Sequence, residues 1–230
     1  MTENQIPQQE ETPKEGWAAL KEELLSSLPL WAREFLEKHA REIISAMLVI
    51  ILGIALWSGY SSYSHKQQSL AAAALGNALR IEESQKKIAA LEEVIKEHSH
   101  TQAAKQAQLI LAAELKKIGK VEKAKAAFKI AASKLDGPLS TSATMGFGYA
   151  SEDLGDLDSA ATAYKKAAER EDGFEAVAYL DLGRVESAKK NNQAAIDAYN
   201  QYITLKSNSK LLDYVRYKIE NLSSALTGGK

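Results

Sequence analysis

The feature that most constrains this chain is a pattern that recurs three times in its C-terminal half. The segments GKVEKAKAAFKIAA from Gly119, GDLDSAATAYKKAA from Gly155 and KNNQAAIDAYNQYI from Lys190 align without gaps. Each places a small residue, then an aromatic residue four positions later, then alanine or tyrosine three positions after that. Because steps of four and three keep side chains on one face of a helix, the pattern predicts three helices of one type.

The spacing of the copies predicts a repeat built from paired helices. Their first alanines, Ala124, Ala160 and Ala195, are 36 and 35 residues apart. Twelve residues before each stands a large-small pair, namely Leu111-Ala112, Phe147-Gly148 and Leu182-Gly183. Small residues on facing helices allow the axes to approach to about 8–10 Å. Because one pair alone cannot bury its apolar face, we expect the pairs to stack, with each aromatic side chain filling the space against the next pair.

Two further segments extend the array. SLAAAALGNALRIEE followed by KKIAALEEVIKEH reads as a weaker first pair, and KLLDYVRYKIENLSSAL as a terminal helix with Leu212, Val215, Ile219 and Leu222 on one face. A helix with a polar outer face suits the end of such an array. The expected fold is all-α: over residues 66–226, an α-solenoid of about four helix pairs plus a capping helix, with 227–230 as a disordered tail.

Residues 43–64, IISAMLVIILGIALWSGYSSYS, contain no charged side chain over 22 positions. About 20 apolar helical residues cross the hydrocarbon of a bilayer, and aromatic rings such as those of Trp57, Tyr60 and Tyr63 favour its headgroup level. The alternatives are a buried helix of a soluble protein, which is usually shorter, and a cleaved signal peptide. More than 40 residues precede the segment, which argues against a signal peptide. We therefore predict an uncleaved transmembrane helix over 43–64.

The charges around this segment favour a cytoplasmic N-terminus. Arg33, Lys38 and Arg41 lie shortly before it, whereas Lys66 and Arg80 follow it. Positive residues concentrate on the cytoplasmic side of membrane spans, so the repeats would lie outside the cytoplasm.

The segment ahead of the predicted span divides in two. Residues 1–14 are polar and read as a disordered cytoplasmic tail, while 15–42 read as amphipathic juxtamembrane helices. The apolar stripe of 15–42 comprises Trp17, Leu20, Leu24, Leu28, Trp31 and Phe35, and Pro29 is expected to open a second helix. A helix on the membrane surface and a docking stripe for another membrane protein both remain open.

The chain shows no pattern typical of a catalytic or metal site. It has no cysteine, and its net charge of −1 gives no sign of nucleic-acid binding. His98 and His100 lie in the turn EHSHTQ without a third metal ligand nearby, which favours a solvated loop. We expect no enzymatic activity, no cofactor or metal, no nucleic acid and no small-molecule substrate.

The repeat unit resembles the tetratricopeptide repeat, whose pattern is W-x2-L-G-x2-Y followed by A-x3-F. Tyr179 stands in the tryptophan position, and Leu182-Gly183 and Ala195/Tyr199 match, whereas Lys190 replaces the usual turn glycine. The resemblance implies a groove lined by the first helix of each pair, which holds extended or helical peptides. By register with the family, the groove-facing residues are Gln106, Leu109, Ala113, Met145, Tyr149, Glu152, Val177, Leu180 and Arg184.

The arrangement as a whole resembles the YfgM-type family of bacterial inner-membrane proteins. The similarity covers roughly residues 30–205, through the lead REFLEKHAREI and above all HTQAAKQAQLILAAELKKIGKVEKAKAAF. It implies an ancillary subunit of the Sec translocon that faces the periplasm beside a membrane-anchored peptidyl-prolyl isomerase and handles newly exported chains. The expected function is thus an inner-membrane protein-interaction scaffold. The alternative is a structural scaffold of an envelope-assembly or cell-division complex.

Overall fold

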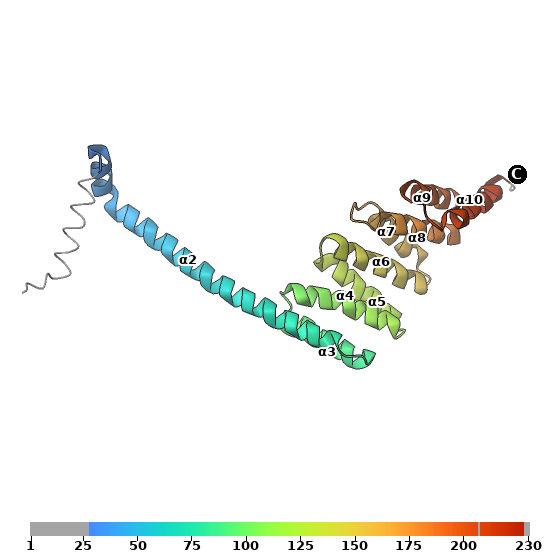
Figure 1. The fold of residues 1–230 in the computed structure, drawn as a ribbon, viewed down its shortest axis with the longest axis horizontal. Helices are drawn as coiled ribbons and strands as arrows, with labels where there is room; N and C mark the ends of the chain where they lie inside the picture. Colours follow the sequence, from blue (N-terminus) through green and yellow to red (C-terminus); the bar gives the residue numbers. More distant parts are fainter. Residues whose placement is uncertain (1–27, 207, 228–230) are drawn as a thin grey trace, which may run out of the picture. The chain divides into compact units, whose positions relative to one another are not determined.

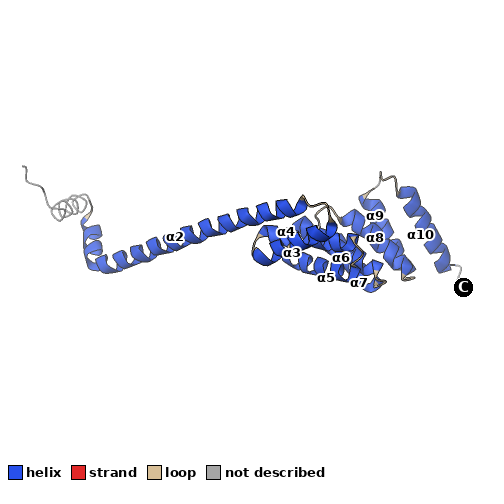
Figure 2. Ribbon diagram, turned by 90° about the horizontal axis from the view of Figure 1, so that it is seen from below, coloured by secondary structure: helices blue, strands red, loops and turns tan. Residues whose placement is uncertain are grey.

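The computed structural model describes residues 28–206 and 208–227, and within these it contains helices but no strand (Figures 1 and 2). The helices are α2 (Leu30–Leu79), α3 (Ser84–Glu97), α4 (Gln102–Lys117), α5 (Val121–Lys134), α6 (Gly137–Asp153), α7 (Leu157–Ala168), α8 (Glu175–Ala188), α9 (Asn192–Leu205) and α10 (Leu212–Thr227). The all-α prediction is confirmed. The predicted tail 1–14, the beginning of 15–42 and residues 228–230 lie outside the described residues, while Thr227 is the last residue of α10.

Helix α2 joins segments that the sequence analysis treated as separate. It begins directly after Pro29, whose carbonyl accepts the Ala32 amide at 2.9 Å, so this proline does open a helix. The helix then continues through 43–64 into the first helix of the weaker first pair. It is continuous because no proline lies between 30 and 79, and because the alanines at 71–74 favour helix over a turn.

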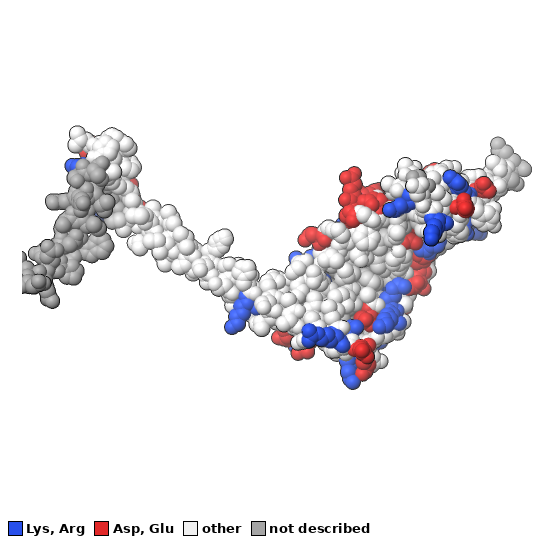
Figure 3. All heavy atoms as spheres, viewed as in Figure 1, with Lys and Arg blue, Asp and Glu red and all other residues white. Residues whose placement is uncertain are grey.

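Most of α2 is long and apolar enough to cross a membrane. The stretch Lys38–Leu79 contains a window with a mean hydropathy of 2.2, none of which is buried inside the structure. The middle of the helix carries neither acidic nor basic atoms in Figure 3. This exposure does not fit the alternative of a core helix in a soluble protein, and α2 therefore contains a candidate membrane span.

The chain divides into two compact units, Met1–Tyr63 and Ser64–Lys230. In the second unit each helix from α3 to α10 packs against the next one along the chain. The end of α2 pairs with α3, since Ala71, Leu75 and Ala78 share a buried cluster with Leu91 and Val94. The pairs α4–α5, α6–α7 and α8–α9 follow, and α10 ends the array (Figure 1). The expected four pairs with a terminal helix are confirmed.

The recurring small and aromatic residues form the centre of this array. All nine are buried: Ala124, Phe128 and Ala131 in α5, Ala160, Tyr164 and Ala167 in α7, and Ala195, Tyr199 and Tyr202 in α9. Placing a Cβ atom on Gly148 would bring it within 2.5 Å of the Tyr164 ring, and one on Gly183 within 2.6 Å of the Tyr199 ring. The glycines are therefore required because the rings lie directly on the backbone of the partner helix.

The direction in which two of these rings pack differs from the expectation. Tyr164 and Tyr199 lie over glycines of their own pair, in α6 and α8, rather than only against the next pair. Phe128 does reach the next pair, where it covers Gly146 of α6. Its own pair offers Ala112 instead of glycine, and the methyl group of this alanine prevents an equally close approach on that side.

The turn before the second helix contains a left-handed residue in the last three pairs. Gly119 and Gly155 fill this position with φ values of 77° and 74°, and Lys190 fills it in the last pair with a φ of 63°. This conformation costs a residue with a Cβ atom roughly 1–2 kcal/mol, whereas glycine adopts it without this steric cost.

Replacing Lys190 with glycine is therefore expected to raise the free energy of unfolding by about 0.5–1 kcal/mol, because relief of strain exceeds the extra chain entropy of glycine in the unfolded state. Urea denaturation of residues 64–230 measures the change. The matched control Gly155→Ala imposes the same strain on a turn that lacks it and should destabilise the protein. A loss of stability in Lys190→Gly would contradict the assignment of this turn.

Candidate functional site

The nine residues predicted to line a groove lie on α4, α6 and α8, the first helices of their pairs. We call the face that they mark the first-helix surface. Ala113, Val177 and Arg184 are exposed, and Gln106, Leu109, Tyr149, Glu152 and Leu180 are partly buried. Helices α4 and α6 are in contact. Eight of the nine residues are therefore accessible from outside.

Met145 is the exception, because its side chain is only 3% exposed. It packs in the core cluster that contains Tyr164 and Val185, between α6 and its neighbours. The prediction that it faces a groove is therefore wrong. Gly148 lets α7 approach α6 closely, and side chains of α7 and α8 cover this part of the helix.

On α6 and α8, the polar residues of the first-helix surface bind one another and their neighbours. The Tyr149 hydroxyl donates to Asp181 Oδ2 at 2.6 Å, and Arg184 Nη2 donates to Asp181 Oδ1 at 2.8 Å. Arg184 Nη1 forms an ion pair with Glu152, whose other carboxylate oxygen accepts the Tyr164 hydroxyl at 3.0 Å. We call these five residues the α6–α8 network, since they connect α6, α7 and α8.

Burial and hydrogen bonding shift the pKa values of two members of the α6–α8 network. Burial raises the pKa of Asp181 above its ordinary value, although the hydrogen bond from Tyr149 opposes this shift. Burial also raises the pKa of Tyr149, and the hydrogen bond to Asp181 raises it further, so the phenol remains a donor. Arg184 thus pairs with both Glu152 and Asp181, so each charged side chain of the network has a partner within the protein, while the two carboxylates outnumber the one cation.

Asp181 is the member of this network that the sequence analysis missed. Its side chain is 14% exposed, and it stands three residues before Arg184 on α8. Because an acidic residue at position i and an arginine at i+3 of one helix can form an ion pair, this spacing could have predicted the contact with Arg184. The contact with Tyr149 comes from 32 positions away and carries no comparable signal in the sequence.

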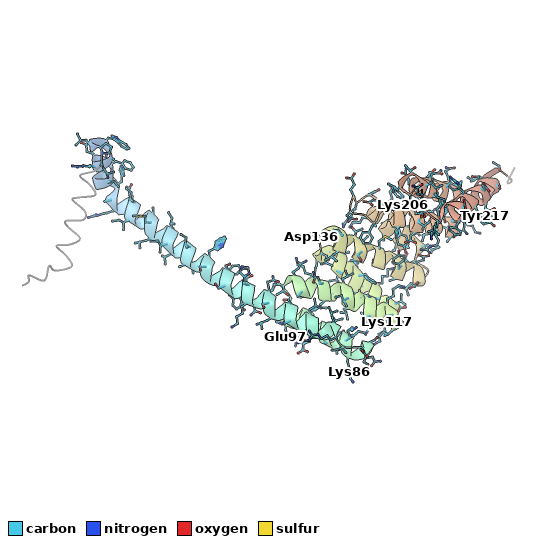
Figure 4. All side chains as sticks on the ribbon, viewed as in Figure 1. Lys86, Glu97, Lys117, Asp136, Lys206 and Tyr217 are labelled. Atoms are coloured by element: carbon cyan, nitrogen blue, oxygen red, sulfur yellow. The ribbon has the colours of Figure 1, made fainter. Side chains whose placement is uncertain are left out.

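Apolar side chains extend the first-helix surface toward the C-terminus. In α10, Val215 and Leu222 are buried, as Ala178 and Val185 are in α8. Tyr214 and Tyr217 therefore take the register positions of Val177 and Leu180. Tyr214 is 46% exposed and Tyr217 59% exposed, and Figure 4 labels the latter on α10. Helix α10 thus closes the array and also extends the first-helix surface by two exposed tyrosine side chains.

Two grooves lie on the other side of the array, between consecutive second helices. The α5–α7 groove has a volume of about 560 Å³ and a floor from α6 that includes Phe147. The α7–α9 groove has a volume of about 470 Å³ and a floor from α8 that includes Leu182. Asp158 and Thr162 of α7 line both grooves. Neither groove was predicted from the sequence, because the resemblance to the tetratricopeptide repeat placed binding residues only on the first helix of each pair.

The described residues contain no group of three or more His, Asp or Glu side chains with the geometry of a metal site. His98 and His100 lie at the end of α3 and in the turn that follows it, ahead of Thr101, which caps α4 by accepting the Ala104 amide.

Comparison with known proteins identifies the repeats. The family model described as a tetratricopeptide repeat-like domain matches residues 33–224. No curated protein matches the chain.

Solved structures show the same fold at low sequence identity. The crystal structure of MamA protein matches with a TM-score of 0.53 and 17% identity, covering 71% of this chain and 90% of that one. A kinesin light chain-type protein from Podosopora anserina with nearly identical TPR-like repeats matches with a TM-score of 0.51 and 15% identity, over 73% and 89% of the two chains. Tetratricopeptide repeat-like arrays are typically non-enzymatic scaffolds for protein-protein interaction. The match over residues 33–224 shows that this chain belongs to the tetratricopeptide repeat-like domain family.

Proposed function

We propose that this protein is a membrane-anchored interaction scaffold of the bacterial inner membrane, with its N-terminus in the cytoplasm and its repeats in the periplasm. The observation that supports this most directly is the joining of a candidate membrane span to a tetratricopeptide repeat-like array through one continuous helix, α2. Such an arrangement holds the repeats at the membrane and leaves their surfaces to bind protein partners.

The first-helix surface is the proposed binding site, without Met145. Its accessible apolar residues, Leu109, Val177 and Leu180, are extended by Tyr214 and Tyr217 of α10. Because each charged side chain of the α6–α8 network already has a partner within the protein, the surface suits an extended, partly apolar segment rather than a strongly charged one. Newly exported chains present such segments before they fold.

The resemblance of the sequence to YfgM-type proteins supports the further proposal that the scaffold works beside the Sec translocon and a membrane-anchored peptidyl-prolyl isomerase, where it helps handle these chains. The second candidate is a structural scaffold for an envelope-assembly or cell-division complex. It is favoured by the same array, since tetratricopeptide repeat-like surfaces also bind folded partners.

Site-specific crosslinking in cells distinguishes the two candidates. A photoreactive residue at Val177, whose side chain is 48% exposed, is expected to capture channel subunits and newly exported chains. The matched control places the same residue at Lys96 of α3, which is 83% exposed but lies on a second helix. Recovery of stable wall-synthesis or division proteins alone would favour the second candidate. Equal capture from both positions would contradict a binding role for the first-helix surface.

The orientation has its own test. In spheroplasts, added protease is expected to cleave residues 64–230 and to leave the N-terminal segment protected. Protection of the repeats would contradict the periplasmic placement, whichever partner is captured.

A further inference from the structure

The α5–α7 groove is lined by two lysine side chains that pair with no acidic side chain of the described residues. Lys129 of α5 and Lys166 of α7 line its two walls, and both are exposed. Within the described part of the chain, neither lysine side chain has a hydrogen bond or an ion pair. The one acidic residue that lines this groove is Asp158, which pairs with Lys189 at 2.9 Å.

Neighbouring lysines differ in this respect. Lys125, one turn before Lys129 on α5, binds Asp156 at 2.6 Å and lies 5.4 Å from the centre of the Phe147 ring. Its charge is therefore compensated by its own chain. The ammonium groups of Lys129 and Lys166 remain available for a ligand.

The floor of the α5–α7 groove is apolar. Phe147 of α6 lies at its base, between Ala132 of α5 and Ala163 of α7. Ser133 and Thr162 lie on its walls, and their hydroxyls donate to carbonyl groups of their own helices. A hollow of about 560 Å³ with an apolar base and two ammonium groups above it fits an apolar side chain flanked by carboxylates.

The α7–α9 groove occupies the equivalent place one repeat later but has the opposite charge. Its lining contains Lys165 and Lys189 against the four acids Asp158, Glu169, Glu186 and Asp197. Lys189 is paired with Asp158 and with Glu186. Two grooves of the same architecture therefore differ in the sign of their net charge, and this difference provides an internal control.

We propose that the α5–α7 groove is a second docking site, which binds a protein segment where acidic and apolar side chains alternate. The apolar side chain fills the hollow over Phe147, while Lys129 and Lys166 reach the flanking carboxylates with their flexible stems. Complementary charge selects the segment and directs it to this groove and away from the α7–α9 groove. A flat anionic lipid surface leaves the hollow unfilled, which favours a protein partner. The site is independent of the first-helix surface and of the identity of the partner there.

Fluorescence anisotropy of the purified full-length protein in an uncharged detergent tests this site. The probe is a short fluorescein-labelled peptide in which glutamate and leucine alternate, and its twin carries glutamine in place of glutamate. The acidic peptide is expected to bind about tenfold more tightly than the twin, and Lys129→Glu combined with Lys166→Glu is expected to remove this preference. Lys165→Glu, the same change in the α7–α9 groove, should leave the affinity within about twofold.

Three results would overturn the proposal. The first is equal affinity for the two peptides, and the second is an equal loss with Lys165→Glu and with the double variant. The third is binding to phosphatidylglycerol vesicles that depends on Lys129 and Lys166 while binding of the peptide does not. As a control, circular dichroism and thermal melting are used to check that the variants fold. None of these results depends on the crosslinks from Val177, so the two proposals can fail separately.

Discussion

Replacing Tyr164 with alanine is expected to lower the free energy of unfolding of residues 64–230 by about 3–5 kcal/mol, as large-to-small substitutions in protein cores do. The side chain is 0% exposed and lies in the cluster that joins α6, α7 and α8. Its ring covers Gly148 and lies 5.4 Å from the Tyr149 ring, and its hydroxyl donates to Glu152. The substitution therefore opens a cavity and also leaves a carboxylate with one partner fewer. Urea denaturation followed by circular dichroism measures the loss.

The control is the same substitution at Tyr217, which is 59% exposed on α10. Because little surface is buried there, Tyr217→Ala should change the stability by no more than about 0.5 kcal/mol. Tyr164→Phe isolates the hydroxyl and should cost about 0.5–1.5 kcal/mol. If Tyr164→Ala costs no more than Tyr217→Ala, Tyr164 does not occupy the centre of the repeat.

The periodic parts of this fold could be predicted from the sequence because packing imposes their spacing. A ring such as that of Tyr199 fits only where the facing helix offers a residue such as Gly183, so the two types recur together at a fixed distance. This regularity gave the helix pairs, their order and the terminal helix. It gave no signal for the continuity of α2, because the first part of that helix lies outside the repeats; the absence of proline between 30 and 79 was the signal for this continuity.

The candidate sites were predicted less completely, since they depend on how consecutive pairs are rotated against each other. The register placed Val177 and Arg184 at an accessible surface but also placed Met145 there, which neighbouring helices cover. The pairing of Tyr149 with Asp181 joins residues on α6 and α8. The unpaired state of Lys129 and Lys166 likewise follows only from knowing that Asp158, the one acidic residue lining the groove, pairs with Lys189 instead. Spacing along the chain does not encode these contacts.

The substitution Gly148→Ala tests the close approach of the helices directly. An added Cβ atom would lie 2.5 Å from Tyr164 Cε1 and 2.9 Å from Cδ1, well inside the contact distance of two carbons. The ring is fully buried and cannot move aside without displacing α7 or α8. We expect a loss of about 1–3 kcal/mol from overpacking, even though alanine favours helix over glycine by about 1 kcal/mol.

The chain offers a matched control in Gly76, where an added Cβ meets nothing within 4 Å. Gly76 also lies within a helix, so Gly76→Ala should stabilise the protein by about 0.5–1 kcal/mol through helix propensity alone. If Gly148→Ala lowers the free energy of unfolding while Gly76→Ala raises it, the loss at Gly148 comes from packing and not from helix propensity. A double-mutant cycle completes the test: with Tyr164→Leu in place, Gly148→Ala should lose most of its cost, because the ring that it would strike is gone. An undiminished cost in that background would show that something other than the tyrosine ring requires glycine at this position.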